Sequence, residues 1–123
     1  MRNSLLLAFG LAIALGSASA SAADIEAGKK VFNKCKACHS LKEGTKKVGP
    51  SLFGIFGKKS GQMEGYHYSK AMKNADITWN EKTLDEYLTK PRNFVKGTKM
   101  TFPGLRKPED RENVIAYLKA NAK

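Results

Sequence analysis

Cys35-Lys36-Ala37-Cys38-His39 holds both cysteines of the 123-residue chain and one of its two histidines. This spacing is the attachment pattern of a c-type haem. Two thiols three positions apart can each form a thioether with a vinyl group of one porphyrin. The histidine that follows is then carried beneath the ring, where a ring nitrogen can bind iron. The motif therefore predicts a fold built around one covalent haem, held by Cys35 and Cys38, with His39 as an iron ligand.

Three other uses of closely spaced cysteines fit the chain less well. A thioredoxin-like redox pair belongs to a strand–helix–strand setting, and no convincing β-rich run precedes Cys35. A zinc site needs about four ligands, whereas the only histidine outside the motif is His67 and no second cysteine or histidine pair is present. A disulfide between Cys35 and Cys38 would be strained and would close almost no loop.

Residues 1–23 have the composition of a secretory signal peptide. Arg2 supplies a positive start, an apolar run extends over 5–15, and small residues fill 18–23. The apolar run is too short to span a bilayer comfortably, which favours a cleaved signal over an uncleaved membrane anchor. We expect cleavage between residues 20 and 23.

Such cleavage leaves one domain, residues 24–123. These 100 residues suffice for a single core, and a buried porphyrin would add a large apolar body to it. Because covalent haem attachment in bacteria takes place outside the cytoplasm, the signal and the haem motif agree on a periplasmic location. The domain has no apolar run long enough to span a membrane and no internal repeat, so we expect a monomer.

Caps, glycines and prolines divide this domain into helices and loops. Four helices are expected, at about 24–36, 69–74, 78 or 80 to 91, and 108–123. The stretches 41–65 and 93–107 carry repeated glycines and prolines, which is typical of loops. With little strand pattern, the chain is predicted to be a small all-α single domain whose helices and glycine-rich loops wrap around one haem.

The second axial ligand determines whether the haem carries electrons or binds small molecules. Candidates are one histidine and three methionines: His67, Met63, Met72 and Met100. Met100 lies in the irregular stretch 96–104, which can fold over a ring face, and a thioether favours ferrous iron. Met72 falls in an expected helix and is more simply a core residue, while the other two lie in glycine-rich, aromatic loop sequence. These grounds favour Met100 and leave the others open.

Charge is the second strong signal. The chain carries +11, and Arg2 is the only charged residue before residue 24, so the domain retains +10. A strongly basic surface indicates nucleic acid, an anionic membrane or an acidic protein face as partner. For an exported protein we expect an acidic protein face and no nucleic acid; the alternative is a surface that only confers solubility.

A series of motifs runs through the chain in a fixed order. After the haem motif come Gly49-Pro50-Ser51-Leu52-Phe53-Gly54, Tyr66-His67-Tyr68-Ser69, Ile77-Thr78-Trp79, Tyr87-Leu88, Gly97-Thr98-Lys99-Met100-Thr101-Phe102 and Val114-Ile115-Ala116-Tyr117-Leu118. In this order and at these separations, residues 28–119 resemble the class I c-type cytochromes, specifically the mitochondrial-like bacterial cytochromes c2.

The resemblance implies one haem c and a role for each matching residue. Met100 would bind iron opposite His39, and the Pro50 carbonyl would accept the other imidazole N–H, fixing the ring. Tyr68 and Trp79 would hydrogen-bond a haem propionate. Tyr87 and Thr98 would face the methionine side, and Phe102 would cover the exposed haem edge.

The implied function is that of a diffusible one-electron carrier and not of an enzyme. Its partners would be the acidic faces of a bc1-type complex, a terminal oxidase or a photosynthetic reaction centre. By resemblance, the basic docking ring around the haem edge contains Lys34, Lys47, Arg92, Lys99, Arg106 and Lys107. The alternative function is a haem enzyme or gas-binding haem protein with an open sixth site.

Four positions depart from the mitochondrial pattern. Met72 stands where an asparagine is common, which makes the pocket less polar. Lys58 replaces an arginine near a propionate and loses the bidentate fork. Lys46 replaces a loop-bracing histidine, and Lys96 replaces a proline, which leaves the methionine loop freer.

Overall fold

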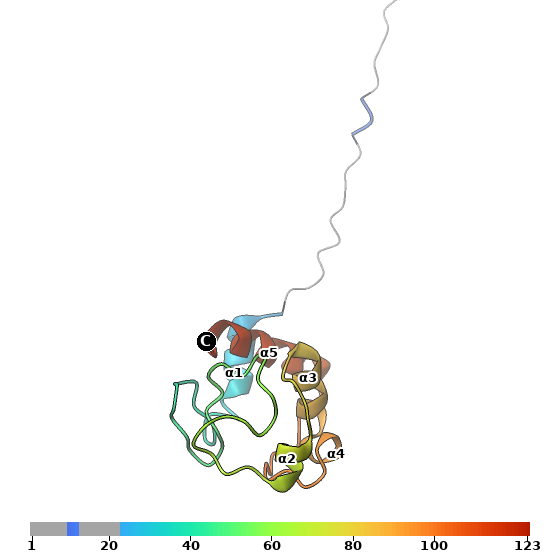
Figure 1. Cartoon of the computed structure of the whole chain (residues 1–123). Coiled ribbons are helices and arrows are strands. Elements are labelled where there is room, and N and C mark those ends of the chain that lie inside the picture. Colours follow the sequence, from blue (N-terminus) through green and yellow to red (C-terminus); the bar gives the residue numbers. More distant parts are fainter. Residues whose placement is uncertain (1–9, 13–22) are drawn as a thin grey trace, which may run out of the picture.

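The computed structural model describes residues 10–12 and 23–123 (Figure 1). Apart from 10–12 and 23, the predicted signal peptide, with its cleavage site between 20 and 23, lies outside the described residues. The helices are α1 (Ile25–Phe32), α2 (Lys70–Asn74), α3 (Glu81–Thr89), α4 (Pro91–Phe94) and α5 (Pro108–Asn121).

The domain is helical, as expected. Within 10–12 and 23–123 the only β pairing is one isolated antiparallel bridge between Lys59 and Thr78. No helix in this part of the chain combines the length and apolar character that crossing a membrane requires. The all-α prediction is therefore confirmed.

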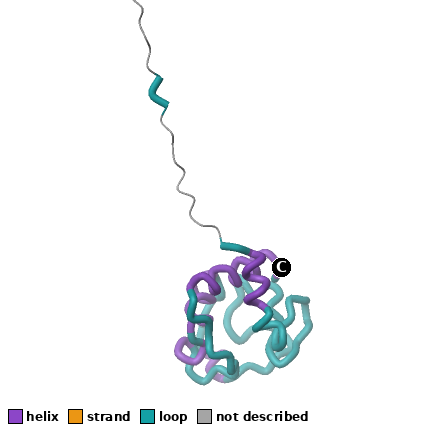
Figure 2. Tube along the Cα trace, turned by 180° about the vertical axis from the view of Figure 1, so that it is seen from behind, coloured by secondary structure: helices purple, strands orange, loops and turns teal. Residues whose placement is uncertain are grey.

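The helices are grouped at two ends of the domain. In Figure 1, α1 and α5 cross at the top and α3 runs down one side. The short helices α2 and α4 lie at the opposite end, and the long loop between α1 and α2 forms the other side. Figure 2 shows from behind that loops, rather than helices, enclose most of this loop side.

Side-chain caps explain where three helices begin. Asp24 Oδ1 accepts a hydrogen bond from the Ala27 N–H at 3.1 Å and starts α1. Ser69 Oγ caps α2 in the same way. At α3, Asn80 and Thr83 each accept the other's backbone N–H at 2.9 Å, which forms a capping box.

The haem-attachment motif itself is not helical. The first helix was predicted to reach about Lys36, but α1 ends at Phe32. Beyond it the hydrogen bonds tighten: the Cys35 N–H donates to the Phe32 carbonyl at 2.8 Å and the Cys38 N–H donates to the Cys35 carbonyl at 3.0 Å. Three-residue turns of this kind are common at helix ends. Here they occur beside four-residue bonds, since the Lys36 N–H also donates to the Phe32 carbonyl and the His39 N–H donates to the Cys35 carbonyl.

Pro91 divides what was predicted to be one helix. The third helix ends at Thr89, Lys90 is extended with φ −161° and ψ 93°, and Pro91 then opens α4, which reaches into the predicted loop. Proline has no N–H to continue a helix and pushes the preceding residue out of the helical region. Its fixed φ suits the first position of a new helix.

The crossing of α1 and α5 requires a glycine. A Cβ on Gly28 would overlap the Asn113 carbonyl oxygen and lie 2.9 Å from the Tyr117 Cβ. Around this contact, the ring centroids of Phe32 and Tyr117 are 5.4 Å apart, and Val114 is 1% exposed. The first and last helices are thus packed tightly against each other.

Gly28→Ala should therefore destabilise the protein by forcing α1 away from α5. We expect the free energy of unfolding to fall by roughly 1–3 kcal/mol, as for other overpacked sites. Equilibrium urea unfolding measures this, with Lys30→Ala on the exposed side of α1 as the control, expected within about 0.5 kcal/mol of the parent. Equal stability of the two variants would contradict the packing argument.

Candidate functional site

A cavity of about 350 Å³ lies inside the domain. Apolar side chains of α1, α3 and α5 form much of its wall, together with residues of three loop segments: 48–50, then 66 with 68–69, and 98–102. Every residue predicted to bind the haem or its iron is on this wall: Cys35, Cys38, His39, Pro50, Tyr68, Trp79, Tyr87, Thr98, Met100 and Phe102. Residues separated by up to 67 positions thus meet around one space.

Both thiols are free, and their chemistry differs from that of a redox pair. Cys35 is half-buried and Cys38 is exposed. Burial, and to a lesser degree the neighbouring Cys38, raises the pKa of the Cys35 thiol to about 11, against a smaller opposite effect of Lys34. Reactive cysteines of the thioredoxin kind have lowered pKa values. The raised pKa of Cys35 is therefore the opposite of what a redox pair of this kind needs.

The backbone around residue 50 fixes the orientation of His39. Its Nδ1 lies 2.8 Å from the Pro50 carbonyl oxygen, which is the contact that the resemblance implies. Because a carbonyl only accepts, Nδ1 carries the proton and Nε2 keeps the lone pair a metal needs. Burial lowers the pKa of His39, more than the Pro50 hydrogen bond raises it, which favours the neutral, metal-binding imidazole.

Gly49 makes this arrangement sterically possible. A Cβ at this position would lie 2.6 Å from His39 Cε1 and 2.9 Å from Nδ1. The Gly49 N–H also donates to the Cys38 carbonyl at 2.8 Å, so the loop is joined to the haem motif. No role was predicted for Gly49, although its position directly before Pro50 was the available signal.

Of the four candidates for the second axial ligand, two reach the cavity. Met100 and Met72 line the wall, whereas Met63 and His67 are outside it. Met72 is a buried residue of α2, as its expected core role implies. Met100 is half-buried, and its N–H lies 3.4 Å from Thr98 Oγ1, which in turn is 2.8 Å from the Tyr87 hydroxyl.

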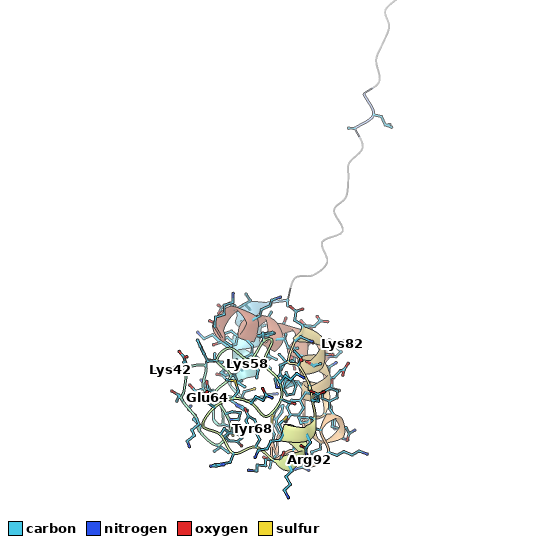
Figure 3. All side chains as sticks on the ribbon, in the orientation of Figure 1. Lys42, Lys58, Glu64, Tyr68, Lys82 and Arg92 are labelled. Carbon is cyan, nitrogen blue, oxygen red and sulfur yellow. The ribbon has the colours of Figure 1, made fainter. Side chains whose placement is uncertain are left out.

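Aromatic residues fill the rest of the wall. Trp79 is buried, and its ring centroid is 5.2 Å from that of Tyr87. Tyr68 packs edge-to-face on Tyr66, with centroids 4.8 Å apart. In Figure 3, Tyr68 lies next to α2, within the outline of the fold. Phe102 is half-buried on the same wall. These rings keep the cavity apolar while Tyr68 brings a hydroxyl to it.

The six predicted docking residues are all exposed: Lys34, Lys47, Arg92, Lys99, Arg106 and Lys107. Lys34 and Lys99 also border the cavity. Lys47 and Lys99 line a second, open pocket of about 450 Å³, and the other three line neither. Figure 3 shows Arg92 at the periphery of the domain beside the short helices.

These residues fit a porphyrin better than a bare metal ion. Within 10–12 and 23–123, no three His, Cys, Asp or Glu side chains gather in a metal-binding cluster. Iron in a porphyrin already has four nitrogen ligands, and it needs only two from the protein. An apolar cavity with two thiols, an oriented imidazole and a thioether on its wall meets those requirements.

Comparisons with known proteins agree with the geometry. Residues 25–122 match the sequence model of the family described as cytochrome c. The chain is 55% identical over 98 residues to cytochrome c2 of Rhodoblastus acidophilus, covering 79% of this chain and 92% of that protein. It is 48% identical over 102 residues to cytochrome c of Nigella damascena, covering 81% and 92%. Cytochrome cH from Methylobacterium extorquens has a similar structure, with a TM-score of 0.74, 43% identity and coverage of 79% and 98%.

Alkaline pH should weaken the fold through Tyr87. Burial raises the pKa of this phenol above its ordinary value of 10, more than the hydrogen bond with Thr98 lowers it. The folded protein therefore holds this proton to higher pH than the unfolded chain does. The resulting stability is complete below about pH 10 and is lost as the pH rises through the folded-state pKa.

Tyr87→Phe tests this assignment. We expect the free energy of unfolding at about pH 7 to fall by about 1 kcal/mol because the hydrogen bond with Thr98 is lost. We also expect a shallower alkaline fall than in the parent, with Tyr68, whose pKa burial also raises, supplying the remainder. Urea unfolding at several pH values measures both effects, and Tyr117→Phe is the control. An unchanged alkaline slope in Tyr87→Phe would refute the assignment.

Proposed function

Since this chain belongs to the cytochrome c family, whose members are electron carriers, we propose that it is a periplasmic shuttle with haem c ligated by His39 and Met100. The family binds haem c covalently through a cysteine pair, and Cys35 and Cys38 are that pair here. The bound haem supplies one-electron chemistry, alternating between ferric and ferrous iron. The observation that carries the proposal is the meeting of both thiols, the imidazole and the thioether on one cavity wall.

The protein's part in this function would be to hold the two proposed ligands, His39 and Met100, still. The Pro50 carbonyl accepts a hydrogen bond from the His39 ring, and the backbone of Gly49 lies directly against the ring. The Tyr87–Thr98 hydrogen bond holds the loop that carries Met100. Fixed ligands keep the site nearly unchanged between the two oxidation states, and a thioether raises the reduction potential.

The alternative, an enzyme or gas-binding protein, requires an open sixth position and usually an acid–base residue beside it. His67 is the only histidine left for that role, and it is outside the cavity wall. Its backbone carbonyl accepts a hydrogen bond from Lys99 Nζ at 2.7 Å. Met100, by contrast, is on the cavity wall, where its thioether could fill the sixth position, and this favours the electron carrier.

Docking is assigned to the exposed basic residues named above. Their charge would draw the acidic face of a redox partner to the side of the domain where Lys34 and Lys99 border the cavity. The partner would be a bc1-type complex, a terminal oxidase or a photosynthetic reaction centre. Residues 1–23 would direct export to the periplasm and be removed between 20 and 23, leaving residues 24–123 as a monomeric carrier.

Replacing Met100 tests the axial ligation. The oxidised parent should show the weak long-wavelength absorption band of sulfur bound to iron, and its reduced form should resist carbon monoxide. Met100→Ala should abolish the band and admit carbon monoxide while the covalent haem is retained. Met72→Leu, on the same wall, is the matched control and should keep the band. A parent without the band, or one that binds carbon monoxide readily, would favour the alternative.

Salt dependence tests the docking surface. Electron transfer to a purified bc1-type complex should slow as ionic strength rises, because screening weakens the steering. Lys99→Gln and Lys34→Gln should each reduce the low-salt rate roughly two- to five-fold. The exposed Lys82→Gln on α3, outside the docking set, should leave it unchanged. Rates that ignore ionic strength would argue against electrostatic docking.

A further inference from the structure

The loop that carries Met100 is held at both ends by α3, and we infer that Arg111 is the positioning residue that fixes the C-terminal end of this loop. The inference rests on the proposed ligation by Met100. Arg111 belongs to α5 and does not line the cavity, so it touches neither the haem site nor Met100. It would act on the iron–sulfur bond only through the backbone of residues 105 and 106.

The N-terminal end of the loop is held through a side chain of α3. The Tyr87 hydroxyl and Thr98 Oγ1 are 2.8 Å apart. The Thr98 N–H donates to the carbonyl of buried Val95 at 3.1 Å, which ties this end to the core. Residue 98 is thus anchored two positions before Met100.

The C-terminal end is held through the backbone of α3. The Leu105 N–H donates to the Leu88 carbonyl at 2.7 Å, and the Leu105 side chain is 3% exposed. Gly104 permits this approach: its φ is +111°, and a Cβ there would lie 2.9 Å from the Thr89 carbonyl carbon. The end of α3 and the end of the methionine loop are therefore in backbone contact.

Arg111 completes this second attachment. Its Nε donates to Asp85 Oδ1 at 2.7 Å, and its Nη1 donates to the Leu105 carbonyl at 2.8 Å and the Arg106 carbonyl at 3.2 Å. The residue is 9% exposed. One planar guanidinium thus joins α5, α3 and the base of the loop. A lysine has no fork that could make these contacts together.

The free part of the loop is short as a result. Only 99–104 lie between the attachments at Thr98 and Leu105, and Met100 is near the start of this stretch. Displacing the Met100 sulfur from iron requires the loop to lift, and lifting costs less when one attachment is weakened. Because the Tyr87–Thr98 hydrogen bond does not involve Arg111, loosening Arg111 would weaken the C-terminal attachment while the N-terminal one stays in place.

Imidazole titration of the oxidised holoprotein tests the inference, with the sulfur-to-iron absorption band as readout. Arg111→Lys should lower the imidazole concentration for half-loss of the band about ten-fold, the effect of losing hydrogen bonds from a charged group. Asp85→Asn, which keeps Arg111 but removes its ionic partner, should lower it about three-fold. Asp85 is partly exposed, so this variant is expected to fold even where Arg111→Lys does not.

Two controls separate positioning from general stability. The Lys119–Glu81 ion pair also joins α5 to α3 but makes no contact with the loop, so Glu81→Gln should leave the titration unchanged. Ile115→Val, in the core face of α5, should lower the free energy of unfolding without changing the titration. Urea unfolding of every variant provides the comparison.

The outcomes are distinct. Easier displacement in Arg111→Lys and Asp85→Asn, but in neither control, supports the inference. If Ile115→Val eases displacement equally, Arg111 acts only through global stability and the inference fails. Unchanged titrations in Arg111→Lys and Asp85→Asn also overturn it, while a normal band in the parent preserves the proposed function. A parent lacking the band overturns both.

Discussion

The hydrogen bond between His39 Nδ1 and the Pro50 carbonyl is the constraint from which the site is built. This hydrogen bond sets the tautomer of the His39 ring, and Gly49 restricts the plane of the ring. Both features suit the proposed role of His39 as a ligand, which needs a free lone pair. The attachment cysteines are held on the same wall by the turns after α1. The remaining wall residues would then enclose the haem, whose position the thiols and the imidazole would already restrict.

The third helix organises the remainder. Its apolar face, with Leu84, Tyr87 and Leu88, forms part of the cavity wall. Its polar groups hold the methionine loop at Thr98 and Leu105. One helix thus contributes to enclosure and, under the proposed ligation by Met100, to the positioning of a ligand.

Much of this was predictable from the sequence because its causes are local. The cysteine–histidine spacing, the caps at Asp24 and Asn80 and the glycine-rich loops each act within a few residues. The end of α1 and the separate helix α4 were missed, although Pro91 carried the signal for the second. Arg111 reads in the sequence as one more basic residue among many. Its burial depends on Asp85 and on loop carbonyls that only the folded chain brings to it.

The contact between α1 and α5 has a consequence for how the polypeptide is made. Asp24 donates its N–H to Asn113 Oδ1 across 89 positions at 2.8 Å, and Gly28 lies against the same residue's backbone. A nascent chain cannot complete this crossing until its last helix has left the ribosome, since non-local contacts form only when both segments exist. Until then the first helix lacks the surface of α5 on which it packs.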